Sequence, residues 1–157
     1  MKEKILEAFR DLGFKLEEEE GMGYCFNYEG LNLLYMYNEN DEEFLNIALP
    51  GIVEVEEDRM LQICALLEKI NSTLKYVKTY MLGNSVWLFY ERELFGEEDL
   101  MTVISRMILH LEAGLVFARK AMAEIEETMA NDSSADDTAE SAEEIVTEEI
   151  ADDEDIE

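Results

Sequence analysis

The sequence has few of the residues on which most catalytic and metal sites depend. One histidine and two cysteines occur among 157 residues. A protein zinc site takes about four His, Cys or carboxylate ligands, and His110 has no second histidine near it. No glycine-rich phosphate loop or nucleophile motif is present. The sequence therefore predicts no catalytic residues, no metal site and no cofactor. An enzyme with paired carboxylates stays open, because such pairs form in space rather than in sequence.

Basic residues are also scarce. There are 12 Lys and Arg against 39 Asp and Glu, a formal net charge of −27. Residues 1–130 hold all 12 basic residues and 26 acidic ones, whereas 131–157 hold 13 acidic residues, so the two parts carry −14 and −13. A field of that sign repels phosphate backbones and anionic lipids. We therefore expect neither nucleic acid nor membrane as a partner, while basic peptides, cations and simple solubility stay open.

Long apolar runs are missing from the printed sequence. No stretch approaches the ~20 consecutive apolar residues of a membrane helix. The opening "MKEKILEAFRDLGF" has the charge of a signal peptide but lacks its apolar run. Cys25 and Cys64 are far apart, and nothing marks them as a pair. We predict a cytoplasmic protein with two reduced thiols.

What the sequence does contain is a regular succession of helix and strand patterns. Apolar residues at helical spacing predict a first helix over 2–13, a second from Asp58 to Asn71 and a long third of about 30 residues from Glu97. The second helix should bury one face, made by Met60, Ile63, Cys64, Leu67 and Ile70. Alternating apolar residues predict five strands, which cover 24–28, 31–37, 44–49, 74–82 and 85–91.

Turn residues separate these strands. Glu29-Gly30 and Gly83-Asn84 have the length and composition of tight hairpin turns, and Pro50-Gly51 should end the third strand. The predicted fold is α+β: an antiparallel sheet of about five strands flanked by helices, in the order α-β-β-β-α-β-β-α. Its domain would cover 1–129. Residues 130–157 have almost no bulky apolar residues and should form a disordered acidic tail.

The aromatic residues concentrate in the predicted strands. Eleven of the fifteen lie in 24–44 or 76–90. Both faces of the predicted sheet are apolar in places, whereas an antiparallel sheet with one solvated face alternates apolar and polar residues. Either helices cover both faces, or a second subunit covers one. A plain core and a ligand groove both stay open for these residues. The candidate contact residues for another protein are Trp87, Phe89, Tyr35 and Tyr37, with Leu115 and Met122 on the overhanging end of the last helix.

One stretch carries a family resemblance. The segment "LLEKIN", with Leu66, Leu67, Ile70 and Asn71, ends a helix ahead of "VWLFYEREL" and a final amphipathic helix. Together with the element order over about residues 1–125, it resembles the YbjN-like proteins. The resemblance implies the fold of type III secretion chaperones, which are small, acidic, dimeric and not enzymes. It also brings the broad label of sensory transduction regulator, and it implies no catalytic residue.

Two functions from different classes follow. The first is a non-enzymatic, homodimeric, chaperone-like adaptor or regulator that binds an extended or amphipathic segment of another protein. The alternative is a small-molecule-sensing regulatory domain with an aromatic pocket. An open apolar groove at a sheet edge would favour the adaptor, and a closed cavity with convergent polar groups would favour the sensor.

Overall fold

The fold is built on one six-stranded sheet. The computed structural model describes the backbone of residues 1–151 and the side chains of residues 1–132. Every pair of neighbouring strands is antiparallel, and the order across the sheet is β1-β2-β3-β4-β6-β5. The strands are β1 (Glu17–Glu19), β2 (Gly23–Tyr28), β3 (Leu31–Met36), β4 (Phe44–Glu54), β5 (Val77–Leu82) and β6 (Ser85–Glu93).

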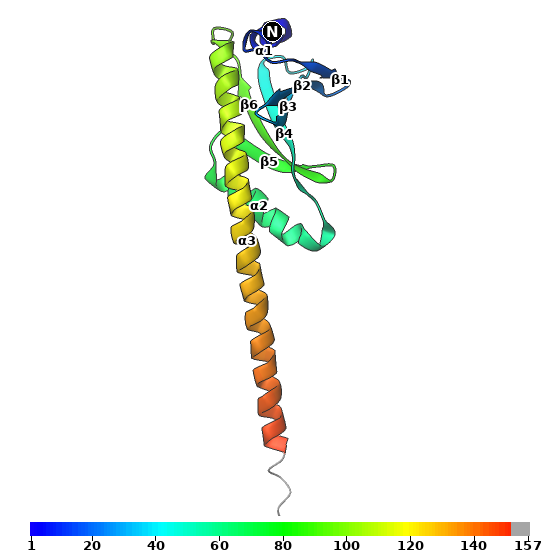
Figure 1. Cartoon of the computed structure of the whole chain (residues 1–157), viewed down its shortest axis with the longest axis vertical. Helices are drawn as coiled ribbons and strands as arrows, with labels where there is room; N and C mark the ends of the chain where they lie inside the picture. Colours follow the sequence, from blue (N-terminus) through cyan, green and yellow to red (C-terminus); the bar gives the residue numbers. More distant parts are fainter. Residues whose placement is uncertain (152–157) are drawn as a thin grey trace, which may run out of the picture.

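Three α-helices pack on this sheet: α1 (Lys2–Asp11), α2 (Met60–Thr73) and α3 (Leu100–Ala151), with a 3-10 turn η1 (Glu57–Arg59) leading into α2. In Figure 1, α3 runs along the sheet and projects far beyond it. The predicted α+β class, antiparallel sheet and flanking helices are confirmed. All three helices contribute buried residues to one core, which they share with a single face of the sheet.

The sheet has one strand more than predicted. β1 consists of Glu17, Glu18 and Glu19, all exposed, and it pairs with β2 at the edge of the sheet. Three successive glutamates show no apolar alternation, so the sequence gives no strand signal there. Their pairing partner supplies the order, because β2 offers a free row of backbone donors and acceptors. Charged side chains on an edge strand also oppose further pairing with other chains.

β4 is longer than predicted, and the expected stop at Pro50-Gly51 is wrong. The strand runs through both residues to Glu54, and its register with β6 shifts between Leu49 and Val53. Gly51 has φ 66°, a conformation open to glycine at little cost. Proline and glycine therefore form a bulge within a paired strand, and pairing on both sides of the bulge keeps the strand continuous.

The second hairpin is confirmed, with small changes at its ends. β5 and β6 are joined by Gly83-Asn84, and Gly83 has φ 62° while Asn84 is not in the left-handed region, as in a type II′ turn. α2 buries Ile63, Leu66 and Ile70, whereas Cys64 is exposed. The predicted buried face was therefore wrong at Met60, which is also exposed, and at Cys64, because only a narrow stripe of α2 meets α3 and β5.

α3 is the main core helix. Its buried residues follow a helical repeat along the sheet. At Gly114 the helix approaches so closely that an added Cβ would lie 3.4 Å from side-chain atoms of Leu88 and Val77. By length and composition the segment from Leu100 to Asp132 could also cross a membrane, contrary to the expectation of no such stretch. Here its apolar stripe is used by the core, and the absence of a membrane partner stays a prediction.

The predicted acidic tail begins inside α3. The backbone of α3 is helical to Ala151, and residues 152–157 lie outside the described residues. The final helix thus continues well beyond Met129, where the sequence predicts the domain to end. The predicted disorder of 130–157 in solution stays a prediction.

Candidate functional site: the uncovered face of the sheet

The two faces of the sheet differ in what covers them. On one face, the inward residues of the strands join residues of all three helices in a single core. On the other face a second, smaller cluster consists only of strand residues: Leu34, Ala48 and Phe89 are buried, and Cys25, Met36 and Trp87 pack partly buried around them. We call this side the uncovered face. Among the described residues no helix contributes to its cluster, so helices do not cover both faces of the sheet there. Cover of this face by a second subunit stays a prediction.

Strand register arranges the uncovered face in rows. A row is a line of residues that lie directly opposite one another on neighbouring strands. One row crosses all six strands, from Glu17 on β1 to Lys78 on β5. Its middle is apolar, and its members in order are Glu17, Cys25, Leu34, Ala48, Phe89 and Lys78. The neighbouring row holds Met36, Asn46 and Glu91. Rows on one face lie two residues apart along a strand, roughly 7 Å.

Three stacked aromatic rings lie across the middle of this face. The Phe89 ring lies 4.1 Å from that of Tyr80, at an interplanar angle of 4°, and 5.9 Å from that of Trp87. Trp87 donates a 2.9 Å hydrogen bond from Nε1 to Ser85 Oγ, which fixes its indole. Phe89 is 0% exposed, whereas Tyr80 is 39% exposed and Trp87 is half-buried. Phe89 is thus a core residue of the face, and Tyr80 and Trp87 form its accessible surface.

Carboxylates lie at the borders of the apolar middle. Burial, followed by the charges of Glu19 and Glu17, raises the pKa of the Cys25 thiol, so the thiol stays protonated near neutral pH. A reactive cysteine needs the opposite, a positive neighbourhood. Lys78 pairs with Glu91 at the far end of the face. The face is therefore apolar in the centre, with the β1 carboxylates at one margin and the Lys78–Glu91 ion pair at the other.

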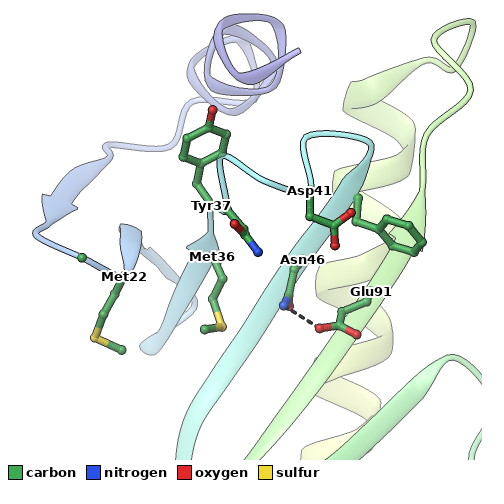
Figure 2. Close-up of a pocket in the computed structure, with 9 residues that line it drawn as sticks. Met22, Met36, Tyr37, Asp41, Asn46 and Glu91 are labelled. Atoms are coloured by element: carbon green, nitrogen blue, oxygen red, sulfur yellow. Dashed lines mark hydrogen bonds between the residues drawn. The ribbon is translucent and has the colours of Figure 1, made fainter.

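A cavity of about 350 Å³ opens at the end of this face, between the β1–β2 turn and the loop that joins β3 to β4. Met36, Asn46 and Glu91 form part of its lining from three adjacent strands. Figure 2 shows Met22 and Met36 on one side and Asp41 and Glu91 on the other. Asn46 donates a 2.7 Å hydrogen bond from Nδ2 to Glu91 Oε1, and its buried Oδ1 has no hydrogen-bond partner among the described residues.

The carboxylates around this cavity differ in how far they are neutralised. Glu91 accepts from Asn46 and pairs with Lys78. Glu42 accepts a 2.7 Å hydrogen bond from Tyr37 Oη, which raises the pKa of that phenol. No ion pair or hydrogen bond joins the Asp41 carboxylate to the described side chains. Asp41 is therefore the uncompensated charge at the mouth of the cavity.

The structure brings together only part of the predicted contact set. Trp87 and Phe89 share the uncovered face, as predicted for one strand face. Tyr35 is 1% exposed on the opposite face, where its ring lies 5.6 Å from that of Phe9, and burial raises the pKa of its phenol. Tyr37 lines the cavity, and the Lys2 ammonium lies 4.4 Å from its ring centroid.

The two helix residues lie apart from this face. Leu115 and Met122 are 6% and 8% exposed, and they line a small groove between α3 and the bulge of β4. His110 packs edge-on against Tyr76 and Tyr90. Among the described residues, no three His, Cys, Asp or Glu side chains are grouped so that they could hold a metal ion.

Sequence reasoning missed the polar half of the site. Alternation in β3 did mark Leu34 and Met36 as a second apolar face, and the hairpin register could have added Tyr80 opposite Trp87. The sequence did not group Asp41, Asn46 and Glu91, because a loop and two strands far apart in the chain bring them together.

Comparison with known proteins supports the fold alone. No family model and no curated protein matches the sequence. Among solved structures, YbjN from E. coli, described as a proposed transcription regulator, is 14% identical, with a TM-score of 0.59 over 76% of this chain and 92% of that one. An uncharacterized protein from Methanothermobacter thermautotrophicus is 17% identical, with a TM-score of 0.52 over 81% of this chain and 97% of that one. At such identities the element order and sheet topology carry the likeness, and they show that this chain has a YbjN-like fold.

Proposed function

We propose that the chain is a non-enzymatic, homodimeric adaptor or regulator that binds a segment of another protein on the uncovered face of its sheet. The observation that carries this proposal is the apolar cluster on a face to which no described helix contributes. Contiguous apolar surface on a soluble domain commonly marks an interaction site. The fold likeness to a proposed transcription regulator agrees with a regulatory role. The −27 charge favours a protein partner over direct contact with DNA.

The layout of the aromatic residues favours the adaptor over the small-molecule sensor. The rings of Tyr80 and Trp87 each stack on the buried Phe89 ring, across two strands. The two accessible rings therefore form part of a broad surface rather than the wall of a closed chamber. A partner segment of several residues can cover such a surface. Aromatic anchors of this kind supply much of the binding energy at protein interfaces.

Trp87→Ala should separate binding from stability. The indole is half-buried at the surface, and loss of an aromatic anchor costs ~2 kcal/mol or more of binding, roughly a 30-fold weaker Kd. We expect the variant to keep a melting transition within a few degrees of the wild type. A partner captured from native cytoplasm and identified by mass spectrometry would then be purified, and its Kd measured by calorimetry.

The matched control for this experiment is Phe95→Ala. Phe95 is 77% exposed in the loop after β6 and is outside the apolar cluster of the uncovered face, so its loss should leave the Kd unchanged. Equal affinity of the wild type and Trp87→Ala for the same purified partner would overturn the proposed face. Equal losses in both variants would show that the effect is not specific to it.

The homodimer is expected to form through α3. Leu109 and Val116 are 52% and 63% exposed and lie seven residues apart, with Ala113 between them on the outer side of the helix. Apolar residues at this spacing form the seam of paired helices.

Light scattering on the full chain at micromolar concentration checks the dimer. We expect the mass of two chains for the wild type and of one chain for the Leu109→Arg/Val116→Arg double variant, because charge cannot be buried at the seam. Leu61→Arg is the control, since Leu61 is 70% exposed on α2. A wild-type mass of one chain would contradict the dimer, and a monomeric Leu61→Arg would contradict its location.

A further inference from the structure

We infer that the cavity beside the uncovered face receives a lysine or arginine side chain of the bound segment. This inference rests on the proposed function and assigns the chemistry of its partner. The cavity of about 350 Å³ is large enough for one long side chain and lies near the lower limit for small-molecule sites. Its lining has acidic and amide groups but no lysine, arginine or histidine.

Charge selects a cation for this cavity. The Asp41 carboxylate stands at the mouth without an ion-pair partner among the described residues, whereas Glu42 is occupied by Tyr37 and Glu91 by Asn46 and Lys78. An entering ammonium or guanidinium would gain a charge-assisted hydrogen bond to Asp41. The net charge of −27 raises the local concentration of cationic segments further.

The apolar walls select a side chain rather than a metal ion. Met22, Met36 and Phe44 supply thioether and aromatic surface to the cavity, and the methylene stem of lysine or arginine buries against such surface while its charged end reaches a carboxylate. A hard cation such as Ca²⁺ takes six to eight oxygen ligands. The two carboxylates and two amides of this lining offer fewer, and thioethers do not suit it.

Register connects the cavity to the apolar cluster. Met36, Asn46 and Glu91 form the row next to Leu34, Ala48 and Phe89 on the same three strands. The rows are roughly 7 Å apart, which is two residues of an extended chain. Because that row is buried, the accessible anchor surface is the next row, Trp87 and Tyr80. We therefore expect the bound segment to carry its lysine or arginine about four positions from an apolar anchor, so that one segment contacts both places.

The probe for the test is Nα-acetyl-arginine amide, and its neutral isostere Nα-acetyl-citrulline amide is the control ligand. The full chain, labelled with ¹³C at its methionine methyl groups, is titrated by NMR, since Met22 and Met36 line the cavity. We expect both methyl signals to shift with the arginine probe at millimolar concentration. Citrulline amide and CaCl₂ should leave them in place.

Asp41→Asn should weaken the arginine probe about fivefold, the effect of losing a well-placed, partly exposed ion pair. The matched control is Glu39→Gln, in the same loop but outside the cavity lining, which should change the Kd by less than twofold. Equal shifts with citrulline, equal affinity in Asp41→Asn, a response to CaCl₂ instead of arginine, or no shift at all would each overturn the cationic site.

Each of the two proposals can be overturned without the other. A purified partner whose binding depends on Trp87 but is equal in the wild type and Asp41→Asn would overturn the cationic site and leave the proposed function intact. Binding of the arginine probe at Met22 and Met36, combined with partner affinity that does not respond to Trp87→Ala, would overturn the proposed face instead.

Discussion

Phe89→Ala is expected to destabilise the protein by ~3–5 kcal/mol, the usual cost of deleting a buried phenylalanine. Phe89 lies on the face that no described helix covers, yet it is 0% exposed. Its ring is held between those of Tyr80 and Trp87, and its strand neighbour Ala48 is small enough to leave room for it. Removal leaves a cavity that these rigid neighbours cannot fill. For a domain of this size the Tm should fall by roughly 10 °C or more.

Urea unfolding followed by circular dichroism measures this loss. Phe95→Ala removes the same side chain from a site that is 77% exposed, so its free energy of unfolding should stay within about 0.5 kcal/mol of the wild type. A Phe89→Ala variant as stable as Phe95→Ala would mean that the aromatic stack is open to solvent. Phe89 would then be a contact residue like Trp87, which is what the sequence alone predicted for it.

Gly23→Ala should lower the free energy of unfolding by about 3 kcal/mol or more, because the added Cβ would clash with backbone atoms. Gly23 begins β2 with φ 140°, and a Cβ added there would overlap the carbonyl oxygen of Tyr35 and lie 3.1 Å from Met36 Cα. A clash with backbone atoms cannot be relieved by a rotamer change, so β2 has to move away from β3. We expect loss of the β2–β3 pairing at this end, visible as faster amide hydrogen exchange.

Gly21→Ala is the matched control, two residues earlier, in the turn that leads into β2. Gly21 also has a left-handed φ, 77°, but a Cβ there would meet no atom within 4 Å. Gly21→Ala should therefore lower the free energy of unfolding by only ~1–2 kcal/mol, the usual cost of placing an L-residue in the left-handed conformation. Equal losses of stability at both positions would show that backbone conformation, and not the close approach to Tyr35, sets the cost at Gly23.

Local patterns were enough to predict most of the fold. Alternation in 24–37 and 85–91 produced strands, helical spacing after Glu97 produced the last helix, and the Gly83-Asn84 turn joined the strands on either side of it. These signals persist in the structure because each element buries its own apolar residues. The errors fall where a neighbour overrides local preference: β1 is ordered by β2, and β4 continues through Pro50-Gly51 because β6 pairs on both sides.

The candidate site depends much more on tertiary structure. The sequence by itself determined the acidic charge, the aromatic strands and the existence of a second apolar sheet face, since these follow from composition and from the twofold repeat of a strand. Only the tertiary structure decided that all three helices pack on one face, that Phe89 is buried while Trp87 is accessible, and that Asp41 meets Asn46 and Glu91 around a cavity. The physical reason is that exposure and charge pairing depend on contacts between segments far apart in the chain, and a local sequence pattern carries no information about those contacts.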